Sequence, residues 1–427
     1  MKTFKYITFI DAFFYALMIS STESYALYFH AKNGMEGFQL GFLATFPILA
    51  ASITQLILPN LISNQKIGFG LITTSFLQFL SIIGIVYTHE LKEPFWHLLL
   101  FLSIYWIGGQ NTTLFWLDFT SNFFKKEDYS KFFATRSTFV VIVTMIFYLL
   151  FSYLLENHIS FKILFIIGAI SRFISLSLNF YIVKKIKPIN SENKLSNKQN
   201  HDSVRTEKKV IKRFFIWGGI FRIAVNISSP FFMTYMIKDL ALPTTSYVIL
   251  SSIPFLGRAL YLKSWEKTSK HGRIYYGVQV AAFIIAFLPF GWTVSHAFVY
   301  LIFLQILSGI FWGGMELSQV MMIQHHSHQN SRRLLGIQQT IFTFMSTIGA
   351  MIGGGLIERN YKLDELFIIS TIGRLIVAIG LIYNLRRFTP SRLNFKSGRI
   401  FLFSVLTLRP SPANSGRAIV LPGHSPE

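Results

Sequence analysis

The chain has 427 residues and a formal net charge of +21, yet only 14% of its residues are Asp, Glu, Lys or Arg, whereas 52% are apolar. A soluble domain averages about 25% charged residues, so this composition excludes a soluble globular protein. It contains no cysteine, which excludes disulfides and cysteine-ligated metal sites. We therefore expect an integral membrane protein.

Apolar segments of membrane length follow one another along the chain. A helix needs about 20 mostly apolar residues to cross the hydrocarbon core of a bilayer. About twelve such spans lie near residues 6–29, 38–62, 67–88, 95–121, 132–155, 161–183, 214–237, 244–262, 274–294, 297–323, 334–357 and 364–385. The first resembles the apolar core of a signal peptide, but Asp11 interrupts it and it continues to Phe29, so we interpret it as a span.

The basic residues indicate the orientation of these spans. If the N-terminus is cytoplasmic, 27 Lys and Arg residues fall in the cytoplasmic loops and the near end of the tail, against 6 in the outer loops. The positive-inside rule then predicts that both termini lie in the cytoplasm. We expect the chain in the inner (cytoplasmic) membrane of the cell. Anionic lipid headgroups are the natural partners of this charge, and we expect no nucleic-acid partner.

The spans suggest four regions. Residues 1–183 are expected to form an N-terminal six-helix bundle, 184–213 a basic cytoplasmic linker, and 214–387 a C-terminal six-helix bundle. Residues 388–427 form a cytoplasmic tail that becomes rich in Pro, Ser, Gly and Ala after residue 405. This composition predicts disorder, and we assign the tail no function.

The two bundles share an internal repeat. The segment I-I-G-A-I-S-R at 166–172 corresponds to I-I-S-T-I-G-R at 368–374, and Lys184-Lys185 corresponds to Arg386-Arg387 at the same offset of 202 residues. A shared register across two helices and their ends favours duplication of a six-span unit. We expect Arg172 and Arg374, the repeat-related arginines, to serve packing rather than direct function.

Several motifs resemble the major facilitator superfamily of secondary transporters, over about residues 6–387. The most specific is L-S-G-I-F-W-G-G-M-E-L at 307–317, followed by S-R-R at 331–333 and the glycine-rich I-G-A-M-I-G-G-G-L at 348–356, which is similar to a bacterial drug-exporter-like subgroup. Trp265, Gly272 and Arg273 match the family's loop between the eighth and ninth helices. The first-half copy of that loop, residues 59–68, has no acidic residue.

This resemblance implies an all-α membrane protein with two pseudo-symmetric six-helix bundles. It also implies a substrate site at the interface of the bundles, lined by the first, fourth, seventh and tenth helices, and transport by alternating access. We expect a monomer.

Ionisable residues within spans are costly and therefore become functional candidates. Glu23 is our leading proton-coupling candidate, because a carboxyl group at membrane depth can load and release a proton; a carboxylate merely fixed by a hydrogen bond from a neighbouring helix is the alternative. Asp11 and Glu316 are further candidates. Asp11 lies ~18 Å along the helix axis from Glu23 and points about 120° away, so we expect it at a separate cytoplasmic gate.

Polar side chains on the expected cavity helices are the substrate candidates. Arg222 and Asn226 share one face of the seventh helix and suit an anionic or polar group, although a structural salt bridge of Arg222 explains the pattern equally well. In the tenth helix, Trp312, Glu316 and Gln319 share a face that suits an amine beside an aromatic ring. Gln110 and Asn111 represent the fourth helix.

The remaining candidates concern gating or structure. Asp118 and Arg136 both lie near the cytoplasmic ends of their helices, where an interhelical pair is plausible. We read the histidines at 325, 326 and 328 as part of a solvated loop and expect no metal, since no cysteine or acidic cluster accompanies them.

These observations predict a secondary active transporter that exports a small organic solute, driven by protons. The alternatives are an uptake permease or uniporter for a sugar, amino acid or nucleoside, and a non-transporting sensor or a lipid scramblase on the same fold. The sequence contains no GxxxxGK[ST] phosphate-binding motif, so direct use of ATP is not expected. We also expect no cofactor and no enzymatic activity, because no nucleophile–base constellation is present.

Overall fold

A computed structural model describes residues 2–61, 66–88, 90–91, 94–121, 123, 126–185, 204–269, 274–326, 331–386, 402 and 405. Within these ranges the regular structure is entirely helical. The expected all-α architecture of twelve long helices, six in each half of the chain, is confirmed. Most of the expected linker and nearly all of the tail lie outside the described residues.

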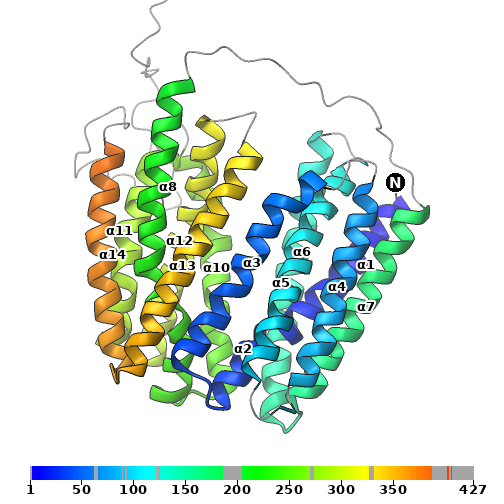
Figure 1. Cartoon of the computed structure of the whole chain (residues 1–427), viewed down its shortest axis with the longest axis horizontal. Helices are drawn as coiled ribbons and strands as arrows, with labels where there is room; N and C mark the ends of the chain where they lie inside the picture. Colours follow the sequence, from blue (N-terminus) through cyan, green and yellow to red (C-terminus); the bar gives the residue numbers. More distant parts are fainter. Residues whose placement is uncertain are drawn as a thin grey trace, which may run out of the picture. The chain divides into compact units, whose positions relative to one another are not determined.

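The first half consists of six long helices (Figure 1). The first of these is interrupted: α1 (Lys2–Met18) and α2 (Ser24–Lys32) are joined by one turn of π-helix, Ile19–Glu23. The others are α3 (Gly37–Leu61), α4 (Ile67–Thr88), α5 (Phe95–Ser121), α6 (Lys126–Glu156) and α7 (Phe161–Lys185).

The second half begins with α8 (Val204–Asn226), which starts within the stretch expected to be a linker. A 3₁₀ turn (Ser229–Phe231), α9 (Phe232–Thr234) and a π-helical turn (Tyr235–Asp239) follow it. The remaining helices are α10 (Thr244–Ser269), α11 (Ile274–Val294), α12 (Phe298–His326), α13 (Ser331–Glu358) and α14 (Leu363–Arg386).

By their internal contacts the residues form two compact units. One comprises Met1–Gln199 with Pro230–Ile249, and the other Asn200–Ser229 with Leu250–Glu427. Two contacts join the segment Pro230–Ile249 to the rest of the first unit. Tyr28 Oη lies 2.9 Å from Thr244 Oγ1, and the Thr245 backbone N–H donates to Glu156 Oε1 at 2.8 Å. The Glu156 carboxylate thus caps the N-terminus of α10.

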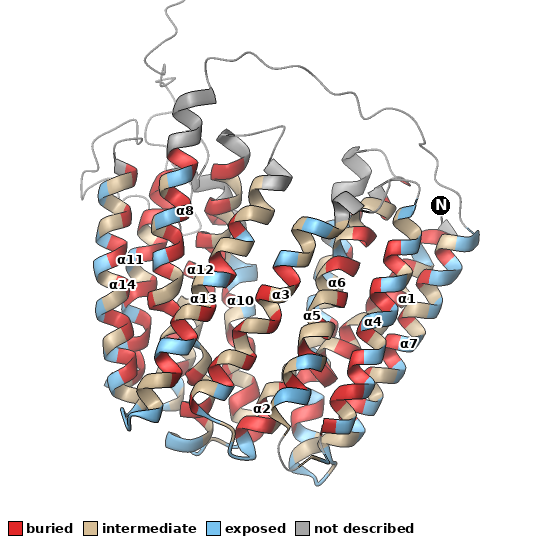
Figure 2. Ribbon diagram, viewed as in Figure 1, coloured by how far each residue is buried: buried red, intermediate tan, exposed pale blue. Residues whose placement is uncertain are grey.

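The buried faces of the helices include many polar side chains beside the apolar core, whereas many large apolar side chains are exposed. In α4, Ser75, Gln78 and Ser81 are buried, whereas the large apolar side chains Phe76 and Ile83 are exposed. Figure 2 shows such buried and exposed bands alternating along the helices. Exposed apolar faces of this extent need a lipid surround, and nine helices of the described chain are long and apolar enough to span a membrane.

Hydroxyl side chains explain the π-helical turn in the first helix. Ser20 Oγ donates to the Leu17 carbonyl at 3.0 Å, and Ser24 Oγ donates to the Ile19 carbonyl at 3.2 Å. Such bonds compete with the regular backbone ladder and bend helices. The turn packs closely on α7, where a Cβ at Gly168 would overlap Thr22 Oγ1.

The predicted seventh span, 214–237, is not one continuous helix. Its α-helical part ends at Asn226, shortly before Pro230, which lacks a backbone N–H and disfavours a helical conformation in the preceding residue. The α14 side chains satisfy the carbonyls released there, because Ser370 Oγ donates to Ala224 O at 2.7 Å and Arg374 Nη2 donates to Val225 O at 2.9 Å. A cation at a helix C-terminus also complements the helix dipole.

Candidate functional site

Glu23 lies at the end of the π-helical turn, where its carboxylate meets α5. Tyr105 Oη donates to Glu23 Oε2 at 2.9 Å. Among the described residues no basic side chain lies within ion-pair distance of Glu23. Tyr105 itself is 1% exposed. The carboxylate is therefore held by one neutral donor rather than by a cation.

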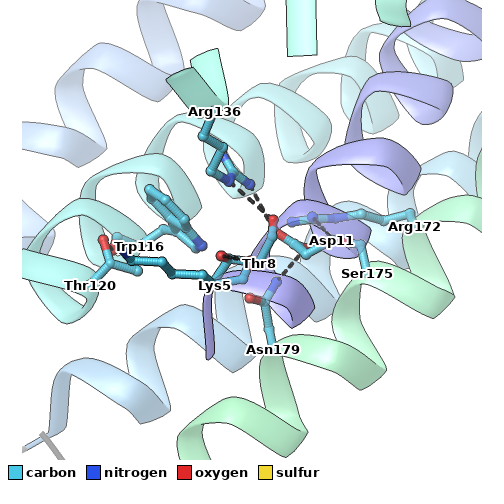
Figure 3. A network of polar contacts seen from close by, with 9 residues as sticks. All are labelled: Lys5, Thr8, Asp11, Trp116, Thr120, Arg136, Arg172, Ser175 and Asn179. Atoms are coloured by element: carbon cyan, nitrogen blue, oxygen red, sulfur yellow. Dashed lines mark hydrogen bonds and ion pairs between the residues drawn. The ribbon is translucent and has the colours of Figure 1, made fainter. Parts of the chain in front are cut away.

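Asp11 has very different surroundings (Figure 3). Its carboxylate accepts bonds from Arg136 Nη2 at 2.7 Å, Ser175 Oγ at 2.7 Å and Asn179 Nδ2 at 3.3 Å. Asp11 is 2% and Arg136 9% exposed. The Arg136 guanidinium also lies 3.9 Å from the ring centre of Trp116. This is a buried ion pair in which the Asp11 carboxylate accepts three hydrogen bonds.

A second arginine extends this network. Arg172 donates from Nη1 to Ser175 Oγ at 3.1 Å and from Nη2 to Thr112 Oγ1 at 3.4 Å. Ser175 in turn donates to Asp11, so one hydroxyl connects the Arg172 guanidinium to the Asp11 carboxylate (Figure 3). The network therefore fastens α1, α5, α6 and α7 to one another.

The α5 candidates lie against α3. Asn111 Nδ2 donates to Thr54 Oγ1 at 2.9 Å, and Gln55 Nε2 donates to the Gln110 backbone carbonyl at 3.0 Å. The side-chain oxygens of Gln110 and Asn111 are buried and have no hydrogen-bond partner within the described part of the chain. Buried acceptors are normally satisfied, so these two oxygens leave α5 with unused hydrogen-bonding capacity in this conformation.

In the second unit, Arg222 lies near two aromatic rings. Its guanidinium carbon lies 5.1 Å from the ring centre of Trp312 on α12 and 5.4 Å from that of Phe342 on α13. These distances are typical of cation–π contacts. The structure thus brings two of the sequence candidates, Arg222 and Trp312, together.

The other second-unit candidates have partners of their own. Glu316 Oε2 forms an ion pair with Arg258 Nη1 at 2.7 Å. Gln319 Oε1 accepts a bond from Gln338 Nε2 at 3.1 Å. Asn226 Nδ2 donates to Ser346 Oγ at 2.9 Å, tying α8 to α13.

The gate candidates are described only in part. Trp265 is fully buried against Gly314 and Phe311 in the apolar core of the second unit. Gly272, Arg273 and His328 lie outside the described residues. Asp118 is partly buried on α5. Where the sequence suggested Asp118 as the partner of Arg136, the structure gives Arg136 the Asp11 carboxylate as an ion partner.

Sequence reasoning missed the neutral members of these sites. Tyr105, Ser175 and Asn179 hold the two acidic groups but carry no charge, so a search for intramembrane charges does not find them. Hydroxyl and amide side chains that share one face of α5 or α7 are the sequence signal that could have indicated them.

The comparisons agree with this architecture. The sequence profile described as Major Facilitator Superfamily matches residues 6–332. The chain belongs to this family of membrane transporters, which move small solutes. No curated protein sequence matches the chain.

Solved structures share the fold at low identity. A crystal structure of the nucleoside transporter NupG has a TM-score of 0.67 at 13% identity and covers 89% of this chain and 98% of its own. A POT family transporter in complex with 5-aminolevulinic acid gives 0.67 at 12% identity, covering 91% and 96%. A bacterial homologue of the human lysosomal transporter Spinster gives 0.57 at 13%, covering 96% and 97%. Such identities establish the fold alone.

Proposed function

We propose that this protein is a secondary active transporter that exports a small amphiphilic organic solute by alternating access, driven by protons. The observation that carries the proposal is the Glu23 carboxylate, which lies within a membrane-spanning helix and is bonded by the neutral hydroxyl of Tyr105 at 2.9 Å. Ionisable residues at such positions are retained chiefly for function.

The Glu23–Tyr105 pair suits reversible protonation. A tyrosine hydroxyl donates to a carboxylate but can also accept from a carboxylic acid. Both protonation states of Glu23 therefore keep a hydrogen-bond partner, and no ion pair has to break when the proton binds. Asp11 differs, because its protonation would leave the Arg136 charge without its partner.

Polar groups suited to a solute occur in each unit. The first unit offers the buried oxygens of Gln110 and Asn111, and the second offers the Arg222 guanidinium beside Trp312. The resemblance of the motif at 307–317 to drug-exporter-like proteins supports export. The distribution of basic residues supports an inner-membrane location with cytoplasmic termini. We propose that the protein acts as a monomer.

Purified protein in liposomes that enclose a pH-sensitive dye tests the proposal. The panel would contain amphiphilic cations, aromatic acids, nucleosides and dipeptides, each added with and without an imposed pH gradient. We expect that at least one solute changes the internal pH of liposomes that contain the protein and does not change it in liposomes without protein. A solute that is transported without proton movement would indicate a uniporter. Absence of transport for the whole panel would favour a sensor or a scramblase.

A further inference from the structure

Three of the arginines in the helices of the second unit, Arg222, Arg258 and Arg374, lie within the predicted spans, and their partners differ. Arg258 is paired with Glu316 at 2.7 Å. Arg374 is 2% exposed and donates to four oxygens, those of Ser370, Ile285, Val225 and Ser228, at 2.9–3.2 Å. Arg222 contacts aromatic rings instead. Arg258 and Arg374 therefore bind oxygen atoms of the protein, whereas Arg222 contacts rings.

The Arg222 guanidinium has unused hydrogen-bonding capacity. Within the described parts of the chain, no carboxylate lies within ion-pair distance of Arg222, and its guanidinium donates no hydrogen bond. Trp312 and Phe342 face the guanidinium, but rings do not replace the acceptors that its five N–H donors require. Arg222 is only partly buried, so these donors are not sealed in the core.

A charge within a membrane span is costly unless it is paired or used. The planar fork of an arginine matches a carboxylate, which accepts two parallel hydrogen bonds from it. The flanking rings fix the guanidinium on helix α8 and provide an apolar surface beside it. Glu316 is near enough to act on the Arg222 charge, but its ion pair is with Arg258.

We propose that Arg222 binds the carboxylate of an amphiphilic organic anion, with the apolar part of that anion against Trp312 and Phe342. This inference rests on the proposed transport function and specifies its substrate class. It replaces the amine that the Trp312–Glu316–Gln319 face suggested, because the negative charge of that face is paired.

The first test needs no ligand. In purified protein, we expect Arg222→Met to leave the melting temperature unchanged or raised, because it removes an unpaired charge and keeps an apolar contact with the rings. Arg374→Met should lower the melting temperature, since it leaves four oxygens without their donor. An Arg222→Met protein that is destabilised like Arg374→Met would overturn the inference by showing a structural arginine.

The second test uses benzoate, phenylacetate and indole-3-acetate, each compared with its neutral amide at equal ionic strength. We expect at least one acid to raise the melting temperature saturably while its amide does not. Arg222→Met should raise the half-saturating acid concentration by at least about tenfold, as expected for lost charge-assisted hydrogen bonds. The control Arg359→Gln, at an exposed position, should respond like the wild type.

Two outcomes contradict the anion site: equal effects of acids and amides, or unchanged acid binding in Arg222→Met. Either result is separable from failure of the proposed function. Loss of the anion site alone would leave proton-coupled movement of neutral or cationic solutes in liposomes. If the proposed transport function fails, no solute moves in the liposome assay, whatever the melting temperature of Arg222→Met is.

Discussion

At the residue scale, the first helix carries two acids in contrasting environments. Asp11 is held by a cation and two neutral donors, and Glu23 by the hydroxyl of Tyr105. Removing a partner from a buried ion pair leaves an uncompensated charge, so Asp11 is suited to holding helices together. Glu23 has no such constraint and is suited to changing its charge.

Arg136→Gln tests the structural role of Asp11. The substitution leaves the Asp11 carboxylate, which is 2% exposed, without its cation. We expect a loss of about 3–5 kcal/mol in the free energy of unfolding, measured by denaturant unfolding of purified protein.

The double variant Asp11→Asn/Arg136→Gln provides the control. It should be more stable than Arg136→Gln alone, because no unpaired carboxylate remains. The single variant Asp11→Asn completes the comparison. If the double variant loses as much unfolding free energy as Arg136→Gln and Asp11→Asn lose together, the two residues are not a coupled pair.

The charged members of these sites could be predicted from the sequence, but their partners could not. Intramembrane charge alone singles out Asp11, Glu23 and Arg222. The partners lie far away in sequence, with Ser175 contacting Asp11 across 164 residues and Tyr105 contacting Glu23 across 82. Such pairings depend on how the helices pack, which periodicity does not determine.

At the element scale, helices α10 and α12 approach each other closely through glycines. A Cβ at Gly309 would overlap the Pro254 carbonyl, and one at Gly257 would lie 2.5 Å from the Ile306 carbonyl oxygen. Backbone atoms cannot rotate away, so this contact depends on the missing side chains. Small residues at helix interfaces are typical of membrane proteins.

Gly309→Ala should therefore destabilise the protein by about 1–3 kcal/mol through overpacking, measured as a lowered unfolding free energy in detergent. The matched control is Gly355→Ala on α13, where a Cβ would meet nothing within 4 Å. That variant should be neutral or slightly more stable, because alanine favours helix over glycine. Equal behaviour of the two variants would contradict the proposed packing of α10 on α12.

Hydropathy predicted the spans but not their interruptions. The π-helical turn Ile19–Glu23 and the end of α8 at Asn226 both fall within predicted spans. A hydropathy window measures composition and is insensitive to the backbone hydrogen-bonding pattern. Pro230 and the hydroxyl residues Ser20, Ser21, Thr22 and Ser24 were the available local signals.

At the whole-molecule scale, the two arginines that correspond in the predicted sequence repeat are both buried. Arg172 and Arg374, 202 residues apart, are 1% and 2% exposed and each binds helices around it. Their partners differ: Arg172 joins a network around a carboxylate, whereas Arg374 binds carbonyls at the end of α8. The packing role expected for both arginines is consistent with these contacts, and the divergence of partners could not be read from the repeat.

The orientation of the chain can be tested directly, because the protein has no cysteine. We expect a cysteine introduced at Asn157, exposed between α6 and α7, to react with a membrane-impermeant maleimide in intact cells. One at Lys66, also exposed, should react only after lysis, since it lies in a predicted cytoplasmic loop. The reverse labelling pattern would show that the predicted orientation is wrong.

The central claim is that Glu23 carries the coupled proton. The most direct measurement is proton movement into or out of proteoliposomes on addition of a transported solute, compared between wild type, Glu23→Gln and the exposed control Glu90→Gln. We predict that Glu23→Gln loses solute-dependent proton movement but still exchanges labelled for unlabelled solute, while Glu90→Gln behaves as wild type. Undiminished proton movement in Glu23→Gln would contradict the account.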